Sequence, residues 1–282
     1  MSDNRRVGQV KEVTSLSNPI VKDIRALAMK KFRDRENAFM AEGLKLVIDA
    51  FDLGWTIRTL VFAKVQRGNP TVEKIAARTV AAGGLVLEAS EKVLGAITRR
   101  DNPQMVVGVF QQRWAALKDI RPADGDVWIA LDRVRDPGNL GTVIRTADAV
   151  GAKGVILVGE TTDPFSVETV RATMGSVFAV PIARAGVEAF LAWRKGVDAT
   201  FVGTHLKGSV DYRTVDYAKG PVVLVMGNEQ QGLPDELAAV CDALIRIPQT
   251  GRADSLNLAV ATGVALYEIR RHALPTVGKD EN

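Results

Sequence analysis

Short apolar segments alternate with segments of helical periodicity from residue 126 to about residue 273. The apolar runs, which include residues 127–134 and 222–227, have the length of strands, and the segments between them, such as 139–150, repeat apolar residues at helical spacing. Continuously apolar strands separated by helices are typical of a mostly parallel sheet covered on both faces. This pattern predicts an α/β domain over residues 126–275, with ligands bound at the carboxyl ends of its strands.

The part of the chain before residue 114 alternates in the same way. Residues 1–113 predict a small α/β sandwich of roughly 100 residues. Residues 114–125, WAALKDIRPADG, contain proline and glycine and interrupt the pattern, so we expect a linker there. Residues 276–282 are polar, and we expect them to form a disordered tail. The sequence therefore predicts two α/β domains joined by a short linker.

Positive charge is concentrated in the first of these domains. Residues 1–113 hold 19 Lys and Arg against 12 Asp and Glu, whereas the remainder holds 18 against 21. A local positive field attracts polyanions, although an ordinary solvated basic surface is the alternative. The cationic residues gather in residues 18–37, where apolar residues recur at helical spacing and predict one amphipathic helix. Its candidate polyanion-binding residues are Lys22, Arg25, Lys30, Lys31, Arg33 and Arg35.

Several classes of protein are disfavoured by simple features of the sequence. No apolar run approaches the ~18 residues that a membrane-spanning helix needs, and the first residues lack the apolar core of a secretory signal. Cys241 is the single cysteine, which excludes an internal disulfide and fits a reducing compartment. His205 and His272 lie too far apart in sequence to show metal-ligand spacing. We therefore expect a cytoplasmic protein that binds no metal and no membrane.

The first segment that could carry chemistry is DPGNLGTVIR, residues 136–145. Asn139 is a candidate helix N-cap, and the glycines at 138 and 141 allow close approach of a ligand to the backbone. Arg145 falls on a stripe that is otherwise apolar, with an ordinary surface arginine as the alternative. The segment contains neither the G-x-G-x-x-G nor the P-loop pattern, so a dinucleotide-dependent oxidoreductase is disfavoured.

Two more segments follow strand ends further along the chain. In VVLVMGNEQQGL, residues 222–233, a buried strand ends at Gly227 and is followed by Glu229, although an ordinary turn is the alternative. In IRIPQTGRADSLN, residues 245–257, a polar loop precedes a long helix. Ser255 or Asp254 could cap that helix, and Asn257 would lie in its first turn.

Together, the three segments resemble the SpoU/TrmH family of RNA 2′-O-ribose methyltransferases in the SPOUT superfamily. Three family motifs carry the resemblance: Asn139, Gly141, Thr142 and Arg145; then Gly227, Glu229 and Gly232; and finally Ile247, Pro248, Ser255, Leu256 and Asn257. Each motif is weak alone, but the three in order and properly spaced are specific. The basic N-terminal part resembles the substrate-binding domain of the family. Gln249 and Asn228 depart from common family residues, at positions to which the family assigns no catalytic role.

This resemblance implies methylation of a ribose 2′-hydroxyl with S-adenosylmethionine, with ribosomal RNA favoured as the substrate over transfer RNA. A non-catalytic RNA-binding or ribosome-assembly protein is an alternative. The implied fold is an α/β knot, a trefoil-knotted and mostly parallel sheet, preceded by a small RNA-binding α/β sandwich. The implied assembly is a homodimer through the knotted domain. The basic residues of 18–37 become candidate RNA contacts.

The resemblance also implies roles for individual residues. The catalytic candidates are Arg145, Asn139, Glu229, Ser255 and Asn257, and the cofactor-binding candidates are Thr204, Gly227, Ile247 and Leu256. Arg145 is the implied base or activator. Because an arginine of pKa roughly 12.5–13.8 stays charged, its more secure role is to hold the target phosphate. We expect Glu229 to orient Asn139 or Arg145, and Ser255 and Asn257 to position Arg145 or the ribose.

Overall fold

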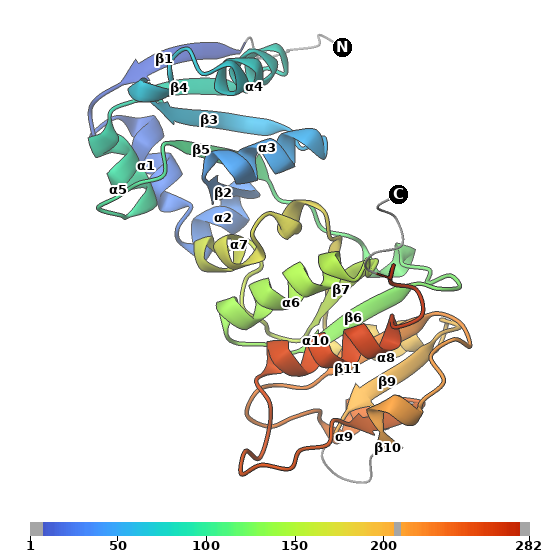
Figure 1. Ribbon diagram of the computed structural model, residues 1–282. Helices are drawn as coiled ribbons and strands as arrows, with labels where there is room; N and C mark the ends of the chain where they lie inside the picture. Colours follow the sequence, from blue (N-terminus) through green and yellow to red (C-terminus); the bar gives the residue numbers. More distant parts are fainter. Residues whose placement is uncertain (1–7, 206–209, 277–282) are drawn as a thin grey trace. The chain divides into compact units, whose positions relative to one another are not determined.

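The computed structural model describes residues 8–205 and 210–276 (Figure 1). The chain forms two compact units. Unit 1 consists of Met1–Gln112 with Asp163–Ala179, and unit 2 consists of Arg113–Thr162 with Val180–Asn282. Most of the expected tail at 276–282 lies outside the described residues. Each unit is a separate α/β structure, as the sequence predicts.

Unit 1 is built on a five-stranded sheet in the order β1-β4-β3-β5-β2. The strands are β1 (Gln9–Val13), β2 (Ala38–Glu42), β3 (Ile57–Ala63), β4 (Leu85–Ala89) and β5 (Val106–Gln111). β5 runs antiparallel to β2 and β3, and the other pairs are parallel. Helix α1 packs on α5, and α3 packs on α4. The helices are α1 (Pro19–Ala26), α2 (Lys30–Glu36), α3 (Leu44–Asp52), α4 (Pro70–Ala81), α5 (Glu91–Thr98) and α7 (Val167–Thr173).

The single helix expected over residues 18–37 is wrong, because the segment forms two helices. α1 ends before Leu27, and Met29 is extended, with φ −100° and ψ 132°. Helix ends leave carbonyl groups without partners. Here the Arg33 guanidinium donates from one nitrogen to the carbonyls of Leu27 and Ala28, at 2.8 and 2.9 Å. A side chain of α2 therefore satisfies the end of α1 and stabilises the break.

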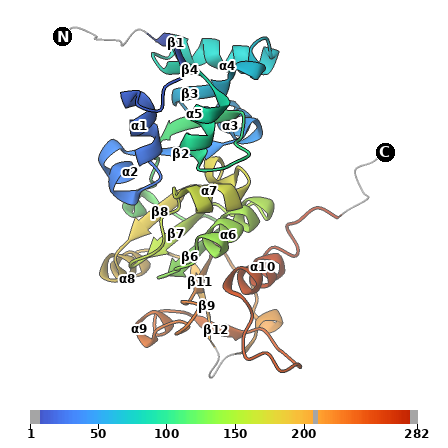
Figure 2. The same cartoon turned by 90° about the vertical axis from the view of Figure 1, so that its left-hand side faces the viewer.

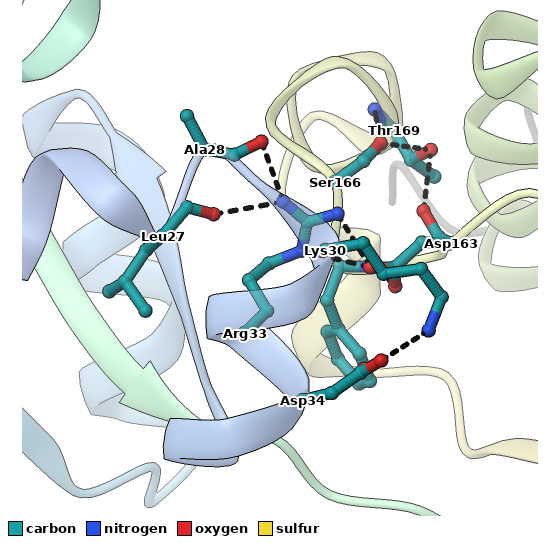
Figure 3. A network of polar contacts seen from close by, with 9 residues as sticks. Leu27, Ala28, Lys30, Arg33, Asp34, Asp163, Ser166 and Thr169 are labelled. Atoms are coloured by element: carbon teal, nitrogen blue, oxygen red, sulfur yellow. Dashed lines mark hydrogen bonds and ion pairs between the residues drawn. The ribbon is translucent and has the colours of Figure 1, made fainter.

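Residues 163–179, which the sequence interpretation placed in the second domain, belong to unit 1. Arg33 forms an ion pair with Asp163 at 2.7 Å, and both side chains are buried (Figure 3). Phe165 and Phe178 pack against the rings of Phe39 and Phe110, with ring centroids 4.7 to 5.9 Å apart. The faces of these four rings are removed from solvent only when residues 163–179 pack on β2. Burial of this apolar surface explains why the segment belongs to unit 1.

Unit 2 is built on a seven-stranded sheet in the order β10-β12-β9-β11-β6-β7-β8, and every pair of neighbouring strands is parallel. The predicted parallel sheet is therefore confirmed. Helices α6 and α10 pack together on one side of the sheet, and α8 lies on the other (Figure 2). The strands are β6 (Val127–Asp132), β7 (Gly154–Val158), β8 (Ile182–Ala185), β9 (Thr200–Thr204), β10 (Val210–Asp211), β11 (Val222–Met226) and β12 (Ala243–Arg246). The helices are α6 (Pro137–Ala149), α8 (Val187–Arg194), α9 (Asp235–Ala238) and α10 (Leu258–Ile269).

The expected linker at 114–125 is part of the packed structure of unit 2. Ala115 forms an isolated parallel bridge with Ala183, which extends the sheet beside β8. Ile120 is buried in the apolar core, and its carbonyl accepts a hydrogen bond from the indole of Trp193 at 3.3 Å. Gly125 does lie in a turn after Pro122, but the apolar residues before the turn hold the segment in place.

Within residues 8–205 and 210–276, no helix is both long and apolar enough to cross a membrane. The trefoil knot implied by the family resemblance stays a prediction.

Candidate active site

The three motif segments meet at the carboxyl edge of the unit 2 sheet. Because the strands are parallel, the loops that follow β6, β11 and β12 all lie at this edge. Helices α6 and α10 begin there, side by side. A polar depression is lined by residues from all three segments, namely Arg135, Asp136, Asn139, Asn228, Glu229, Gln230 and Asn257.

The start of α6 frees Asn139 to face this depression. Asp136 is the N-cap, and its side-chain oxygen accepts from the backbone N–H of Asn139 at 2.6 Å. Pro137 occupies the first turn, where its missing N–H costs nothing. The expectation that Asn139 is itself the N-cap is wrong. Its side chain lies in the first turn, available for other partners.

Glu229, Asn139 and Asn257 form one hydrogen-bonded row across the three segments. The Asn139 amide nitrogen donates to Glu229 Oε1 at 3.3 Å, and its oxygen accepts from the Asn257 amide nitrogen at 2.9 Å. The Glu229 carboxylate also faces the backbone N–H groups of Arg135 and Asp136, at 3.4 and 3.5 Å. Of the two partners expected for Glu229, the structure therefore places Asn139 against it.

Asn257 also caps helix α10. Its side-chain oxygen accepts from the backbone N–H groups of Ala259 and Val260, at 2.9 and 3.3 Å. This use of the oxygen directs the amide nitrogen toward Asn139. The expected caps, Ser255 or Asp254, are wrong, because the helix begins later than the sequence indicated. Ser255 is exposed and makes no hydrogen bond with the residues that the structure describes.

Arg145 is not brought into this row. Its side chain is exposed on α6, and among the described residues it has no hydrogen bond or ion pair. It follows Asn139 by six positions, which at 3.6 residues per turn places it about 120° away around the helix. The apolar stripe that surrounds it in sequence is buried (Leu140, Val143, Ile144 and Ala147). The catalytic role of Arg145 stays a prediction.

The four cofactor-binding candidates lie at the same edge. Thr204 ends β9, Gly227 follows β11 and Ile247 follows β12, and these three strands are neighbours in the sheet. Leu256 is half-buried just before Asn257. A Cβ atom on Gly227 would lie 2.1 Å from the backbone of Gly232, so only glycine allows the loop to fold this closely.

A buried polar group with no partner among the described residues lies in the same loop as Ile247. The side-chain oxygen of Gln249 is buried and accepts no hydrogen bond from the described residues. A buried acceptor without a donor is costly, which makes this atom available to a ligand donor. The described part of the chain contains no group of three or more His, Cys, Asp or Glu side chains that could hold a metal ion. The absence of a metal stays a prediction.

The six predicted RNA-binding residues divide into three groups, the third of which is Arg33 alone. Lys22, Arg25 and Lys31 are exposed without an ion pair among the described residues. Lys30 and Arg35 are exposed but pair with Asp34 and Glu36, at 2.6 and 2.9 Å.

Arg33 is a correction to the predicted RNA-binding set. Its side chain is 4% exposed and is held by Asp163 and the end of α1, so it is buried away from any phosphate at the surface. Asp163 lies 130 residues away in sequence, and no local pattern could have paired the two.

Four residues that line the depression were missed, namely Arg135, Asp136, Asn228 and Gln230. Asp136 could have been found, because an acidic residue directly before proline is a common helix start. Asn228, whose side chain bonds to the β6–α6 loop, gives no such signal, because its partner is a backbone carbonyl remote in sequence.

Comparison with known proteins places this site in context. Residues 126–267 match the SpoU rRNA Methylase family, and residues 18–108 match an MRM3-like substrate binding domain. The chain is 31% identical to the 23S rRNA (guanosine(2553)-2'-O)-methyltransferase RlmP of Bacillus subtilis, over 93% of this chain and 100% of the relative. It is also 31% identical to the 23S rRNA (uridine(2479)-2'-O)-methyltransferase of Streptomyces viridochromogenes, over 88% of each chain.

A solved structure agrees with these matches. An AdoMet-bound rRNA methyltransferase from Sinorhizobium meliloti has a TM-score of 0.91 and 69% sequence identity, over 95% of this chain and 100% of that one. The matched stretch 126–267 contains all three motif segments, including the row of Glu229, Asn139 and Asn257. The resemblance is confirmed, and the chain belongs to the SpoU rRNA methylase family.

Proposed function

We propose that this protein transfers a methyl group from S-adenosylmethionine to a ribose 2′-hydroxyl of ribosomal RNA. The row of Glu229, Asn139 and Asn257 at the carboxyl edge supports this most directly. It joins three separate motif segments of a SpoU-family chain at the place where parallel sheets bind ligands. The relatives named as 23S rRNA 2′-O-methyltransferases support the reaction and the substrate class.

The loops at this edge fit the cofactor. Thr204, Gly227, Ile247 and Leu256 would hold it, with backbone groups for the adenine edge and apolar walls from Ile247 and Leu256. The side-chain oxygen of Gln249, which has no donor among the described residues, could accept from an amino group of the cofactor. When bound, the cofactor supplies an electrophilic methyl group.

The two asparagines have donors left over for the substrate. An amide NH₂ group carries two N–H donors. Asn139 uses one on Glu229 and Asn257 uses one on Asn139, so each keeps one that could hold a ribose oxygen. A ribose hydroxyl must give up its proton to attack. Arg145, exposed on α6, would hold the target phosphate and align that hydroxyl.

Unit 1 would bind the phosphates of the RNA backbone through Lys22, Arg25 and Lys31. The affinity for RNA should therefore fall steeply as the salt concentration rises. Each cation that neutralises a phosphate contributes about 0.7–0.9 to the slope of log affinity against log salt. Replacing all three with alanine should therefore lower the slope by about two to three, measured by filter binding over a salt series. Lys195→Ala, an exposed lysine of unit 2, is the matched control. An unchanged slope in the triple variant would remove these residues from the RNA-binding surface.

The homodimer implied by the family has support in helix α10. A helix that is apolar on all sides is normally buried, yet Val260 and Tyr267 are 53% and 52% exposed on α10. With Val264 they follow one another at i, i+4 and i+7 and form one stripe. We therefore propose that this stripe contacts a second copy. Val260→Glu with Tyr267→Glu should convert a dimer into monomers in analytical ultracentrifugation, whereas a wild-type monomer would contradict the proposal.

Methylation of purified ribosomal and transfer RNA with a methyl-labelled cofactor tests the function. We expect label in ribosomal RNA, mapped as a 2′-O-methyl ribose, and none with Glu229→Ala. Label confined to transfer RNA would change the substrate class. Cofactor binding without methylation of either RNA would favour the non-catalytic alternative. Because the substrate class is ribosomal RNA, we also propose that the protein works in the cytoplasm.

A further inference from the structure

Asn228, which belongs to none of the three motifs, connects two loops of the site. Its amide nitrogen donates to the carbonyl of Arg133 at 2.9 Å. Its oxygen accepts from the backbone N–H groups of Gln230 and Gln231, at 2.8 and 3.3 Å. Backbone hydrogen bonds in both directions also join residue 228 to Gly232, at 3.1 and 2.9 Å. One side chain thus shapes its own loop and fastens that loop to the one after β6.

The partner of Asn228 is itself held firmly. The Arg133 backbone N–H donates to the carbonyl of Val158 at 2.9 Å. Its guanidinium pairs at 2.9 Å with Asp132, whose side chain is 1% exposed. Arg133 also adopts a left-handed backbone conformation, with φ 46°, which is held by these contacts. The carbonyl that Asn228 binds is therefore a fixed point at the end of β6.

Within residues 8–205 and 210–276, Glu229, the next residue, has no comparably short contact. Its carboxylate accepts hydrogen bonds from Asn139 and from two backbone N–H groups at 3.3 to 3.5 Å. These distances are at the long end for a hydrogen bond and give weak positional control. The contacts of Asn228, at 2.8 and 2.9 Å, are shorter. The position of Glu229 therefore depends more on its loop than on its own side-chain contacts.

We infer that Asn228 is a positioning residue for the methyl transfer, which holds the loop so that Glu229 faces Asn139. This inference rests on the proposed function. Asn228→Asp tests it closely, because aspartate keeps the shape and the acceptor for Gln230 but cannot donate to Arg133 when ionised. A misplacement of about 1 Å can cost about a hundredfold in rate. We expect kcat to fall about tenfold to a hundredfold, with the Kd for S-adenosylmethionine, from calorimetry, changed by less than about threefold.

A double-mutant cycle separates this role from a general structural one. If Asn228 acts through Glu229, Asn228→Asp should lower kcat by less than about twofold when added to Glu229→Gln. Gln231→Ala is the matched control: it lies in the same loop, its side chain is exposed, and it keeps the backbone N–H that Asn228 uses. Its kcat should equal that of the wild type.

Three outcomes would overturn the inference. The first is a wild-type kcat in Asn228→Asp. The second is a loss of kcat on adding Asn228→Asp to Glu229→Gln that is as large as the loss in the wild-type background. The third is a loss seen entirely in cofactor affinity, which would make Asn228 a support of the cofactor pocket. Failure of the proposed function would look different, because the wild-type protein would then methylate no ribosomal RNA.

Discussion

Arg33→Met is expected to lower the free energy of unfolding of unit 1 by about 3–5 kcal/mol, the range for removing one partner of a buried ion pair. The side chains of Arg33 and Asp163 are 4% and 8% exposed. The substitution leaves the Asp163 carboxylate buried without its cation. It also leaves the carbonyls of Leu27 and Ala28 without their donor, and a buried group without a partner is destabilising.

Hydrogen exchange in urea is the appropriate measurement, because two units need not unfold together. We expect β2 and α7 to lose protection in Arg33→Met, and the unit 2 sheet to keep it. Adding Asp163→Asn should recover part of the stability, because asparagine is neutral but can still accept from the backbone N–H of Phe165. Lys31→Met, on the same helix but exposed, should change stability by less than about 0.5 kcal/mol. Full protection of α7 in Arg33→Met would show that the ion pair does not hold this segment.

Asn139→Ala is expected to lower kcat about a hundredfold or more, comparable to the loss of one preorganised donor in other active sites. Asn139 is the middle member of the row, so its loss separates Glu229 from Asn257. The cofactor candidates lie at the end of β9 and on the loops after β11 and β12, so the affinity for S-adenosylmethionine should stay close to that of the wild type. Single-turnover methylation of ribosomal RNA, with calorimetry for the cofactor, measures the two quantities separately.

Asn139→Asp is a second test of the same row, because it removes the hydrogen bond to Glu229 and keeps the one from Asn257. Aspartate keeps the oxygen that accepts from Asn257, but it places a second negative charge against the Glu229 carboxylate. Like charges at this distance repel. We expect Asn139→Asp to be at least as impaired as Asn139→Ala. If instead its kcat matched that of the wild type, the row would not be part of the reacting site.

The general plan of unit 2 was predictable because its signal is repeated and local. The strands β6 and β11 are continuous apolar runs. Because the motif segments lie at the ends of parallel strands, a shared edge followed from the topology alone. The details of the helix starts were not predictable in the same way. Asp136 and Asn139 both suit an N-cap, as do Asp254, Ser255 and Asn257. The choice depends on where packing of α6 against α10 begins each helix.

The errors in unit 1 have a different origin. Residues 18–37 repeat apolar residues at helical spacing throughout, but the Arg33 guanidinium that bonds to the end of α1 at the break is also held by Asp163, which is distant in sequence. The placement of residues 163–179 was missed for the same reason, because the residues they contact are also distant in sequence. Their apolar residues recur at the spacing of an ordinary helix. No feature of the neighbouring sequence indicates that Phe165 and Phe178 pack against the rings of Phe39 and Phe110.

Unit 1 is formed by two separate stretches of the chain, residues 1–112 and 163–179, and this affects how the chain folds during synthesis. When residue 112 has left the ribosome, Phe39 and Phe110 still lack the aromatic residues of 163–179 that cover them. The intervening residues, 113–162, must be translated first, which takes several seconds at about 5–20 residues per second. During that interval the nascent chain exposes an apolar surface, and this is the stage at which we expect chaperone binding or aggregation to compete with folding. An early pause in translation within 113–162 should therefore lower the yield of folded protein more than a pause after residue 179.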